Sequence, residues 1–409
     1  MRQHEASHPW ITFVLELGKL DHETWMLLGE AVSKIEHVAG VPLQPAVADE
    51  LNLVYLSKSA HATTQIEGNT LSAEEVRRVV EQKLVLPPSQ EYLAREVENI
   101  VAAYNLIIGE LLQRRIPGLT VDRIKEFNQF VLDGLPRDDE YMVPGELRTK
   151  SVVVGSYRGA PAEDCEYLLA RLCAWLKEFG ESAVEHLRRP LAILAAILAH
   201  LYLAWIHPFW DGNDRTARLV EFQLLLQARL PVIAAHLLSD FYNRTRSEYY
   251  RVLDRTSRPP YPVENFIKYA VRGLVDELTE QISTIRSHQL EIIWHNYIHD
   301  CFHGKNTPAC VRQQLVMLAL PPGWTPISAL PRLTTELAVE YHPKTAKTVT
   351  RDVNALVEMD LVARNRNAVR PRVELMQAFL PPRAEDDEDK NSAARALGKE
   401  VTESLEAKP

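Results

Sequence analysis

Residues 207–218 read His-Pro-Phe-Trp-Asp-Gly-Asn-Asp-Arg-Thr-Ala-Arg, a run that combines a base, carboxylates, a glycine and two arginines. The segment before it, Arg189–Ile206, is strongly apolar and is predicted to be a helix. Because a proline disfavours helical backbone angles at the residue before it, Pro208 predicts that this helix ends at His207. We therefore expect the imidazole of His207 to be exposed at a helix end.

The same run predicts the start of a second helix. Gly212 permits a tight turn, and apolar residues then recur at helical spacing, at Leu219, Phe222, Leu225 and Leu226. This helix is expected to begin near Asn213 or Asp214. Unpaired N–H groups at a helix N-terminus bind anions, and Arg215 and Arg218 would project towards them from one helix face. The turn is thus predicted to be a phosphate site.

Residues 207–218 resemble the Fic motif, commonly written HPFx(D/E)GN(G/K)RxxR, at every specified position except Asp214, where the family usually has Gly or Lys. The resemblance extends through the preceding helix, Pro190–Ile206, in which His200 stands seven residues before His207. It implies a mainly α Fic fold. It also implies transfer of a nucleotide, usually AMP from ATP, to a Ser, Thr or Tyr hydroxyl of a target protein.

The residue types agree with that reaction. His207 is suited to take the proton from the attacking hydroxyl, since an unperturbed imidazole titrates near neutral pH. Asp211 would hold Mg²⁺, a hard cation that favours carboxylate and phosphate oxygens. ATP as donor and Mg²⁺ are therefore the expected cofactors. His200 is expected to pack in the core, because the further ligands of a histidine metal site are missing.

The turn itself would bind the phosphates. Asn213 and the backbone N–H groups from Gly212 to Arg215 would form an anion hole. The guanidinium groups of Arg215 and Arg218 would neutralise the β- and γ-phosphates through paired hydrogen bonds. Together with His207, Asn213 and Arg215 are the expected catalytic residues.

Asp214 leaves two interpretations open. In the first turn of a helix an aspartate interacts favourably with the helix dipole, and a side chain that points to solvent or joins Asp211 at the metal permits ordinary activity. A side chain that points at the nucleotide opposes phosphate binding and alters or weakens donor use. In the family a Lys at this position accompanies phosphate rather than AMP transfer, which implies that the position affects donor handling.

Residues 59–70, Ser-Ala-His-Ala-Thr-Thr-Gln-Ile-Glu-Gly-Asn-Thr, resemble the inhibitory motif of the family, (S/T)xxxE(G/N), with Thr63 and Glu67 at its specified positions. The resemblance implies that Glu67 pairs with Arg218, which then cannot hold the γ-phosphate in the productive pose. The alternative is that the following Gly-Asn pair forms an ordinary helix cap and that Glu67 has no further role.

Three valines, Val152, Val153 and Val154, precede Gly155 and predict a short β-hairpin in an otherwise helical chain. The segment resembles the flap of the family, whose edge pairs with the backbone of the target by strand addition. By that resemblance these four residues bind the target. A hairpin with a purely structural role is the other interpretation.

Residues 246–253, Arg-Ser-Glu-Tyr-Tyr-Arg-Val-Leu, resemble the YYxxL element of the family. The resemblance implies that Tyr249 helps to form the adenine pocket, whereas Tyr250 and Leu253 are expected in the core. Ser257 stands where some members place an asparagine that contacts the nucleotide.

The composition is that of a globular protein with two or three cores: 409 residues, of which 46% are hydrophobic and 25% charged. The longest apolar stretch is interrupted by His200, and no apolar signal core follows Met1. We therefore expect no membrane span, no secretory signal and a cytoplasmic location. The four cysteines show no zinc-site spacing and are expected to be buried thiols. The net charge of −9 argues against non-specific coating of nucleic acid.

Residues 286–383 change in character and resemble a winged helix-turn-helix. The predicted elements are helices at 314–320, 328–341 and 345–359, with a break at 321–323 and a turn at 342–344. The last helix sets an apolar face against Lys347 and Arg351, and a basic wing is expected at 360–373, with Arg364, Arg366, Arg370 and Arg372.

Such a helix and wing suit the major groove of DNA and its flanking phosphates. Winged helices also bind proteins, and here the basic charge is offset by Asp352, Glu358 and Asp360. Contact with DNA and contact with protein both stay open.

We therefore expect four parts: a helical region with the inhibitory motif at 1–110, a Fic-like core at 111–285, the winged helix-turn-helix at 286–383, and a disordered charged tail at 384–409. The expected function is auto-inhibited transfer of AMP from ATP to a target protein, with homodimer formation open. The alternative is a Fic-like protein with an altered donor, or one that regulates through DNA or protein contacts.

Overall fold

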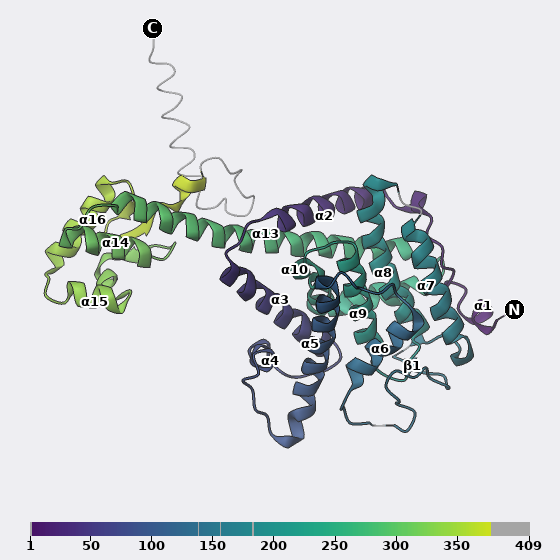
Figure 1. Cartoon of the computed structure of the whole chain (residues 1–409). Helices are drawn as coiled ribbons and strands as arrows, with labels where there is room; N and C mark the ends of the chain where they lie inside the picture. The colour runs from purple at the N-terminus through teal and green to yellow at the C-terminus, as the bar shows by residue number, and fades with distance from the viewer. Residues whose placement is uncertain (1, 138, 156, 182–183, 378–409) are drawn as a thin grey trace, which may run out of the picture. The chain divides into compact units, whose positions relative to one another are not determined.

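The computed structural model describes residues 2–137, 139–155, 157–181 and 184–377. The expected tail at 384–409 lies outside these residues. The chain divides into two compact units, Met1–Thr284 and Ile285–Pro409, and each is described by itself (Figure 1). Helices dominate both units, and the strands that the described residues form are short and antiparallel, which confirms the predicted fold class.

The first unit is built mainly from helices that are joined by loops and one hairpin. They are α1 (Gln3–Ser7), α2 (His22–Gly40), α3 (Pro45–Gln65), α4 (Ala73–Val80), α5 (Glu91–Leu112), α6 (Val121–Leu132), α7 (Cys165–Glu181), α8 (Arg188–Ile206), α9 (Asn213–Gln227), α10 (Val232–Ala235), α11 (Leu237–Arg244), α12 (Arg246–Thr256) and the first part of α13 (Val263–Phe302). Short 3₁₀ helices lie at Leu17–Lys19, Pro88–Gln90, Ala162–Asp164 and Glu185–Leu187. The hairpin consists of β1 (Val153–Val154) and β2 (Tyr157–Arg158).

Helix α8 lies at the centre of the first unit and packs against α7, α9 and α2 (Figure 1). Its side chains from Ile193 to Ile206 are all buried, as expected of a helix that is apolar on every side. By length and composition the segment Glu185–Ile206 could also cross a membrane, but 83% of its apolar window is buried inside the fold. Helix α8 is therefore a helix of the hydrophobic core.

His200 in the middle of α8 belongs to a buried polar network. Its Nε2 lies 2.9 Å from the hydroxyl oxygen of Tyr249, and its Nδ1 lies 3.3 Å from Oε2 of Glu221. Tyr242 donates its hydroxyl to the other carboxylate oxygen of Glu221 at 2.9 Å. Buried polar groups that find partners in this way stabilise a core, so the prediction that His200 packs there is confirmed.

The second unit has its own hydrophobic core. The remaining elements are α14 (Pro308–Ala319), β3 (Thr325–Pro326), a 3₁₀ helix (Ile327–Arg332), α15 (Thr335–Tyr341), α16 (Ala346–Glu358), β4 (Val362–Asn365), β5 (Ala368–Pro371) and a 3₁₀ helix (Val373–Gln377). The three strands form an antiparallel sheet in the order β3-β5-β4. Its core includes Trp294, Ile298, Phe302, Val316, Leu337, Val353, Leu356 and Val369.

Two predicted boundaries in this unit need correction. The helix expected at 328–341 is divided into a 3₁₀ helix that contains Pro331 and the α-helix α15, because a proline lacks an N–H donor and restricts the residue before it. Thr334 caps α15 by accepting a hydrogen bond from the N–H of Leu337. Helix α14 begins at Pro308, well before the expected start, where the side chain of Thr307 caps it.

Candidate active site

The turn between α8 and α9 forms as its sequence predicts. Helix α8 ends at His207, which adopts a left-handed conformation with φ 49°, and α9 follows Gly212, whose φ is 74°. A Cβ atom at Gly212 would lie 3.0 Å from Nδ2 of Asn128 and 3.1 Å from Cγ1 of Val131. Both the positive φ and the close packing therefore require a glycine at this position.

Asn213 holds the shape of this turn with its side chain. Its Oδ1 accepts a hydrogen bond from the N–H of Phe209 at 2.8 Å, and its Nδ2 donates to the carbonyl of Phe209 at 2.9 Å. Asn128 of α6 donates from Nδ2 to the carbonyl oxygen of Asp211 at 2.9 Å. Both ends of the Asn213 amide are therefore bonded to the backbone of Phe209, while the second N–H of its Nδ2 has no bond among the described residues, and its expected role in phosphate binding stays a prediction.

His207 is not exposed as the sequence predicted, since only 9% of its surface is accessible. Arg148 covers this end of α8. Its Nε donates to the carbonyl of His207 at 2.7 Å, and its backbone N–H donates to the carbonyl of Pro208 at 3.0 Å. Its Nη2 donates to the carbonyls of Ala160 and Ile206. Sequence reasoning assigned no role to Arg148, because its partners are backbone carbonyls that no sequence pattern shows.

The environment keeps the imidazole of His207 neutral near pH 7. Burial lowers its pKa to about 4, and the positive charge of Arg148 acts in the same direction, whereas a hydrogen bond to the backbone of Ala204 opposes the shift. A neutral imidazole can accept a proton from a hydroxyl group. His207 therefore has the protonation state that a general base requires.

Arg218 in α9 is held by the segment that follows α3. Its Nη2 donates to Oε1 of Glu67 at 2.7 Å and to the carbonyl of Thr63 at 3.1 Å, and its Nε donates to the hydroxyl of Thr63. Only 1% of Arg218 is exposed, and its Nη1 is buried without a partner. Burial alone would lower the pKa of Arg218, but the carboxylates of Glu67 and Asp214 outweigh it and raise this pKa. Glu67 and Arg218, which the family resemblance predicts to pair, are therefore in contact.

The end of α3 explains how Glu67 reaches this position. The helix ends at Gln65, and Gly68 takes a positive φ of 105° just after Glu67. The N–H of Asn69 donates to the carbonyl of Thr64, which is the backbone closure of a helix C-terminus. The helix cap and the contact with Arg218 are therefore both present, and they are not exclusive interpretations.

Arg215 is engaged by two carboxylates. Its Nη1 lies 3.4 Å from Oε1 of Glu96 in α5, and its Nη2 lies 3.3 Å from Oδ2 of Asp211. The other oxygen of Glu96 accepts a hydrogen bond from Nδ2 of Asn69 at 2.8 Å. This links the loop after Glu67 to Arg215. Sequence reasoning missed Glu96, which lies outside every motif.

Asp211 could hold Mg²⁺. Its side chain is 48% exposed, and only one of its oxygens bonds to Arg215. The described residues contain no cluster of three metal-ligating side chains, so the cation would take its other ligands from nucleotide phosphates and water. Mg²⁺ binds in this way through one or two carboxylates and phosphate oxygens, and the residues present fit it.

A cavity of about 460 Å³ opens beside His207. It is lined by the hairpin residues Val154, Gly155 and Tyr157, by Ala204, Trp205 and His207 at the end of α8, by Asp214 of α9, and by Arg246, Tyr250, Leu253, Asp254 and Arg258. Val152 and Val153 do not line it, but Val153 and Val154 are 57% and 48% exposed on the hairpin. The hairpin thus places exposed apolar side chains at the mouth of the site.

Asp214 lines this cavity together with His207. Burial raises the pKa of its carboxyl group to about 6, and the nearby charge of Glu67 adds to the shift. Of the positions considered for this side chain, the structure thus supports the one beside the expected phosphates.

The two tyrosines of α12 differ in burial from what the sequence predicts. Tyr249 was expected in the adenine pocket, but it is fully buried and its hydroxyl bonds to His200. Tyr250 and Leu253, which were expected in the core, line the cavity. The prediction placed these side chains on the wrong sides of α12, because neighbouring residues point about 100° apart around a helix.

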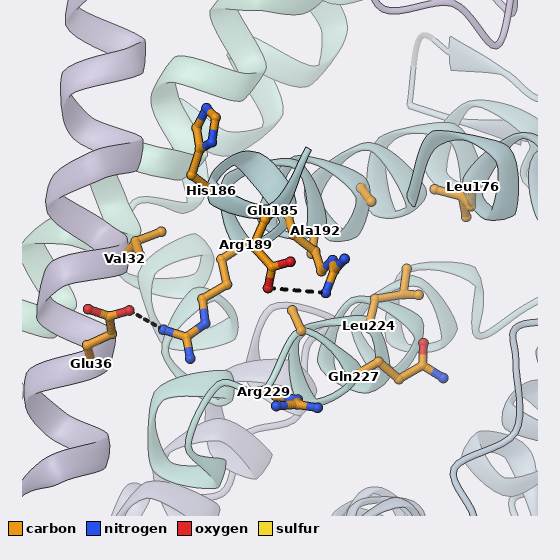
Figure 2. A pocket seen from close by; sticks show the side chains of 13 residues that line it. Val32, Glu36, Leu176, Glu185, His186, Arg189, Ala192, Leu224, Gln227 and Arg229 are labelled. Carbon is orange, nitrogen blue, oxygen red and sulfur yellow. Dashed lines mark hydrogen bonds and ion pairs between the residues drawn. The ribbon is translucent and has the colours of Figure 1, made fainter. Parts of the chain in front are cut away.

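A larger cavity, of about 650 Å³, lies elsewhere in the first unit (Figure 2). Two arginines of its lining are paired with carboxylates of the same lining: Arg189 with Glu36, and Arg188 with Glu185 at 3.8 Å. None of the candidate catalytic, nucleotide-binding, inhibitory or hairpin residues lines this larger cavity. The cavity beside His207 therefore remains the candidate active site.

Residues 118–225 match the Fic/DOC family model. The curated relatives include protein adenylyltransferase fic-1 of Caenorhabditis briggsae, 30% identical over 191 residues that make up 47% of this chain and 34% of the relative. Protein adenylyltransferase Fic of Nematostella vectensis is 26% identical over 259 residues, or 63% of this chain and 55% of the relative. The chain spans only about a third to half of the length of these relatives.

Two solved structures are similar in fold. A Fic family protein from Desulfovibrio desulfuricans is 20% identical, with a TM-score of 0.51 over 84% of this chain and 95% of that chain. A fragment of Fic-1 from Caenorhabditis elegans is 24% identical, with a TM-score of 0.52 over 65% of this chain and 73% of that chain.

The helical fold, with a buried histidine beside a turn that leads into an arginine-bearing helix, is therefore of the Fic class. Residues 118–225 of this chain match the Fic/DOC family model, and its fold is similar to that of the solved Fic proteins.

Proposed function

We propose that this protein transfers AMP from ATP to the hydroxyl group of a Ser, Thr or Tyr in a target protein, and that Glu67 restrains the transfer. The observation that carries the proposal is the position of a neutral, buried His207 beside the turn that leads into α9, with Arg218 of that helix held by Glu67. Two relatives bear the name protein adenylyltransferase, which supports the same activity.

His207 acts as the base of the reaction. It takes the proton of the target hydroxyl, whose oxygen bonds to the α-phosphorus of ATP. The bond from this phosphorus to the bridging oxygen breaks, and pyrophosphate leaves. Backbone N–H groups at the start of α9 and the guanidinium group of Arg215 stabilise the negative charge that develops. Mg²⁺ at Asp211 would add further charge neutralisation on the phosphates.

The hairpin positions the target. Its exposed Val153 and Val154 lie in a two-residue strand, and Gly155 and Val154 line the cavity beside His207. An extended segment of the target could add to this edge through main-chain hydrogen bonds, which would bring its hydroxyl side chain towards the base. The hairpin is thus assigned to target binding.

Glu67 restrains the reaction by occupying Arg218. A guanidinium group that donates to Glu67 and twice to Thr63 has only Nη1 left for a phosphate. Charge-assisted hydrogen bonds contribute about 1.5–3 kcal/mol each. Because about 1.4 kcal/mol corresponds to a tenfold change, removing the carboxylate should raise transfer about tenfold or more.

The test is transfer of label from ATP labelled at the α-phosphate, with Mg²⁺, to the protein itself and to a cell lysate. Glu67→Gly should label about tenfold faster than the wild type, and Glu67→Gln, which keeps the shape but loses the charge, should fall between the two. His207→Ala should abolish labelling in each background. If Glu67→Gly labels nothing, or His207→Ala leaves its labelling unchanged, the proposed function is wrong.

A further inference from the structure

Helix α16 in the second unit presents a basic and polar face. Its buried residues, Val349, Val353 and Leu356, pack into the core of that unit. On the other side, the exposed residues between 347 and 354 are Lys347, Arg351 and Asn354, and the partly exposed ones include two threonines. No large apolar side chain is exposed in this part of the helix.

The aspartate within this stretch does not reduce the basic charge of the face. Asp352 is only 2% exposed and turns inwards, where its Oδ2 accepts hydrogen bonds from Nε of Arg312 at 2.9 Å and from the hydroxyl of Tyr341 at 3.0 Å. A buried carboxylate paired with a guanidinium contributes little field at the surface. The sequence alone counted Asp352, Glu358 and Asp360 against the basic charge. The burial of Asp352 removes the first of these charges, whereas Glu358 is exposed at the end of α16.

A groove of about 530 Å³ runs beside the start of α16. Its lining includes three cationic side chains, Arg332, Lys344 and Arg364, and contains no carboxylate. Thr345 does not cap α16 with its side chain, so the N–H groups at this helix start add to the positive potential. The groove offers hydrogen-bond donors to an anionic ligand from three separate segments of the unit.

The wing contributes fewer free charges than the sequence suggested. Arg370 pairs with Glu374 at 2.8 Å, and Arg372 pairs with Asp360. Arg364 donates to Oδ1 of Asn354 at 2.6 Å, which joins the hairpin β4–β5 to α16. Arg366 is exposed at the tip of the hairpin, and among the described residues no ion pair involves it.

We propose that this surface, made of Arg332, Lys344, Lys347, Arg351, Arg364 and Arg366, binds duplex DNA. An exposed helix with basic and polar side chains fits the major groove, whose bases offer acceptors, and cations on either side of it would contact the backbone phosphates. A protein partner would require apolar or aromatic anchors at the centre of the surface. The exposed Trp324 and Val339 belong to other segments of this unit, and Val357, which is 38% exposed, lies near the end of α16, outside the stretch 347–354.

The test uses the full-length protein and a fluorescein-labelled duplex of mixed sequence, with binding followed by fluorescence anisotropy at several salt concentrations. With five or six phosphate contacts, the slope of log K against log salt should be about −4.5 to −5.5. The triple variant Lys347→Ala, Arg351→Ala, Arg366→Ala should bind at least about tenfold more weakly at low salt, with a shallower slope.

The matched control is the double variant Arg370→Ala, Arg372→Ala, which removes arginines of the same wing that are already paired with carboxylates. Its affinity should stay within about twofold of the wild type. Circular dichroism establishes that both variants are folded. Absence of binding at low salt, or an equal loss in the two variants, would overturn the proposal. So would binding of polyglutamate but not of duplex DNA, because it would mark a surface for acidic proteins.

Discussion

Asp214 brings a carboxyl group next to the place where the phosphates of a donor are proposed to rest. It lines the cavity beside His207, and burial together with the charge of Glu67 raises its pKa to about 6. A group with this pKa is ionised at pH 7.5 and protonated at pH 5. The repulsion between Asp214 and a bound phosphate should therefore depend on pH, and it should be strongest in neutral and alkaline solution.

We predict that Asp214→Asn, introduced beside Glu67→Gly, tightens ATP binding about tenfold or more at pH 7.5, because it removes one like charge from a partly buried site. The gain should shrink towards pH 5, where the native carboxyl group takes up a proton and loses its charge. Burial, the main cause of the raised pKa, is retained without Glu67. Isothermal titration calorimetry at the two pH values measures both effects. Equal gains at both pH values would contradict this account.

At the residue scale, sequence predicted the residues that belong to contiguous motifs, and it placed the contact between Glu67 and Arg218 correctly. It missed Arg148 and Glu96, because a partner made of backbone carbonyls, or one on a distant helix, leaves no local pattern. It placed Tyr250 in the core, whereas Tyr250 lines the cavity and Tyr249 is buried, because both side chains are apolar enough for a core and only the rotation of α12 decides between them.

At the scale of elements, the hairpin and the end of α8 depend on one another through Arg148. This side chain is 4% exposed, and its donors reach carbonyl groups on both sides of the turn, including those of His207 and Lys150. Gly159 makes the close approach possible, since a Cβ atom there would lie 2.9 Å from Nη2 of Arg148 and 3.0 Å from Cβ of His207. The arginine therefore positions His207 and the hairpin that is proposed to bind the target together.

We predict that Arg148→Met lowers the free energy of unfolding by about 2–4 kcal/mol, because it leaves several buried carbonyl groups without donors. Urea denaturation followed by circular dichroism measures the change. Arg158→Met on the same hairpin, where the side chain is exposed, should change stability by less than about 0.5 kcal/mol. Similar effects of the two substitutions would show that Arg148 is not a structural centre of the site.

Periodicity predicted the elements well where a proline or glycine marks a boundary. The end of α8 at His207 and the start of α9 at Asn213 are examples, and both are confirmed. It failed at 328–341, where an apolar pattern continued across Pro331 although the backbone changes from a 3₁₀ to an α-helix. A hydrophobic pattern reports which side chains are buried, whereas the missing N–H of a proline decides where hydrogen bonds stop.

At the scale of the whole molecule, two cores share one chain. The boundary between the units, Thr284/Ile285, falls within α13, whose early residues, such as Leu274 and Leu278, are buried in the first unit. Later residues, such as Trp294 and Ile298, belong to the core of the second. Each unit therefore buries its own apolar surface.

We predict that residues 1–284 and residues 285–377, produced separately, each unfold cooperatively, because each retains a complete core. The shorter fragment should show helical circular dichroism and a single thermal transition. Transfer of AMP by residues 1–284 carrying Glu67→Gly should match that of the same variant at full length. Loss of the thermal transition in residues 285–377 would mean that the two cores are not independent.

The contact between Glu67 and Arg218 also determines how the restraint depends on the concentrations of nucleotide and of protein. A carboxylate carried by the same chain competes with a phosphate as a tethered ligand, and its effective concentration is set by the fold and does not change on dilution. Short tethers give effective concentrations on the order of millimolar, so a nucleotide has to approach that level before it displaces the side chain. The restraint would then act as a threshold on the supply of donor, and it would be indifferent to how many copies of the protein a cell contains.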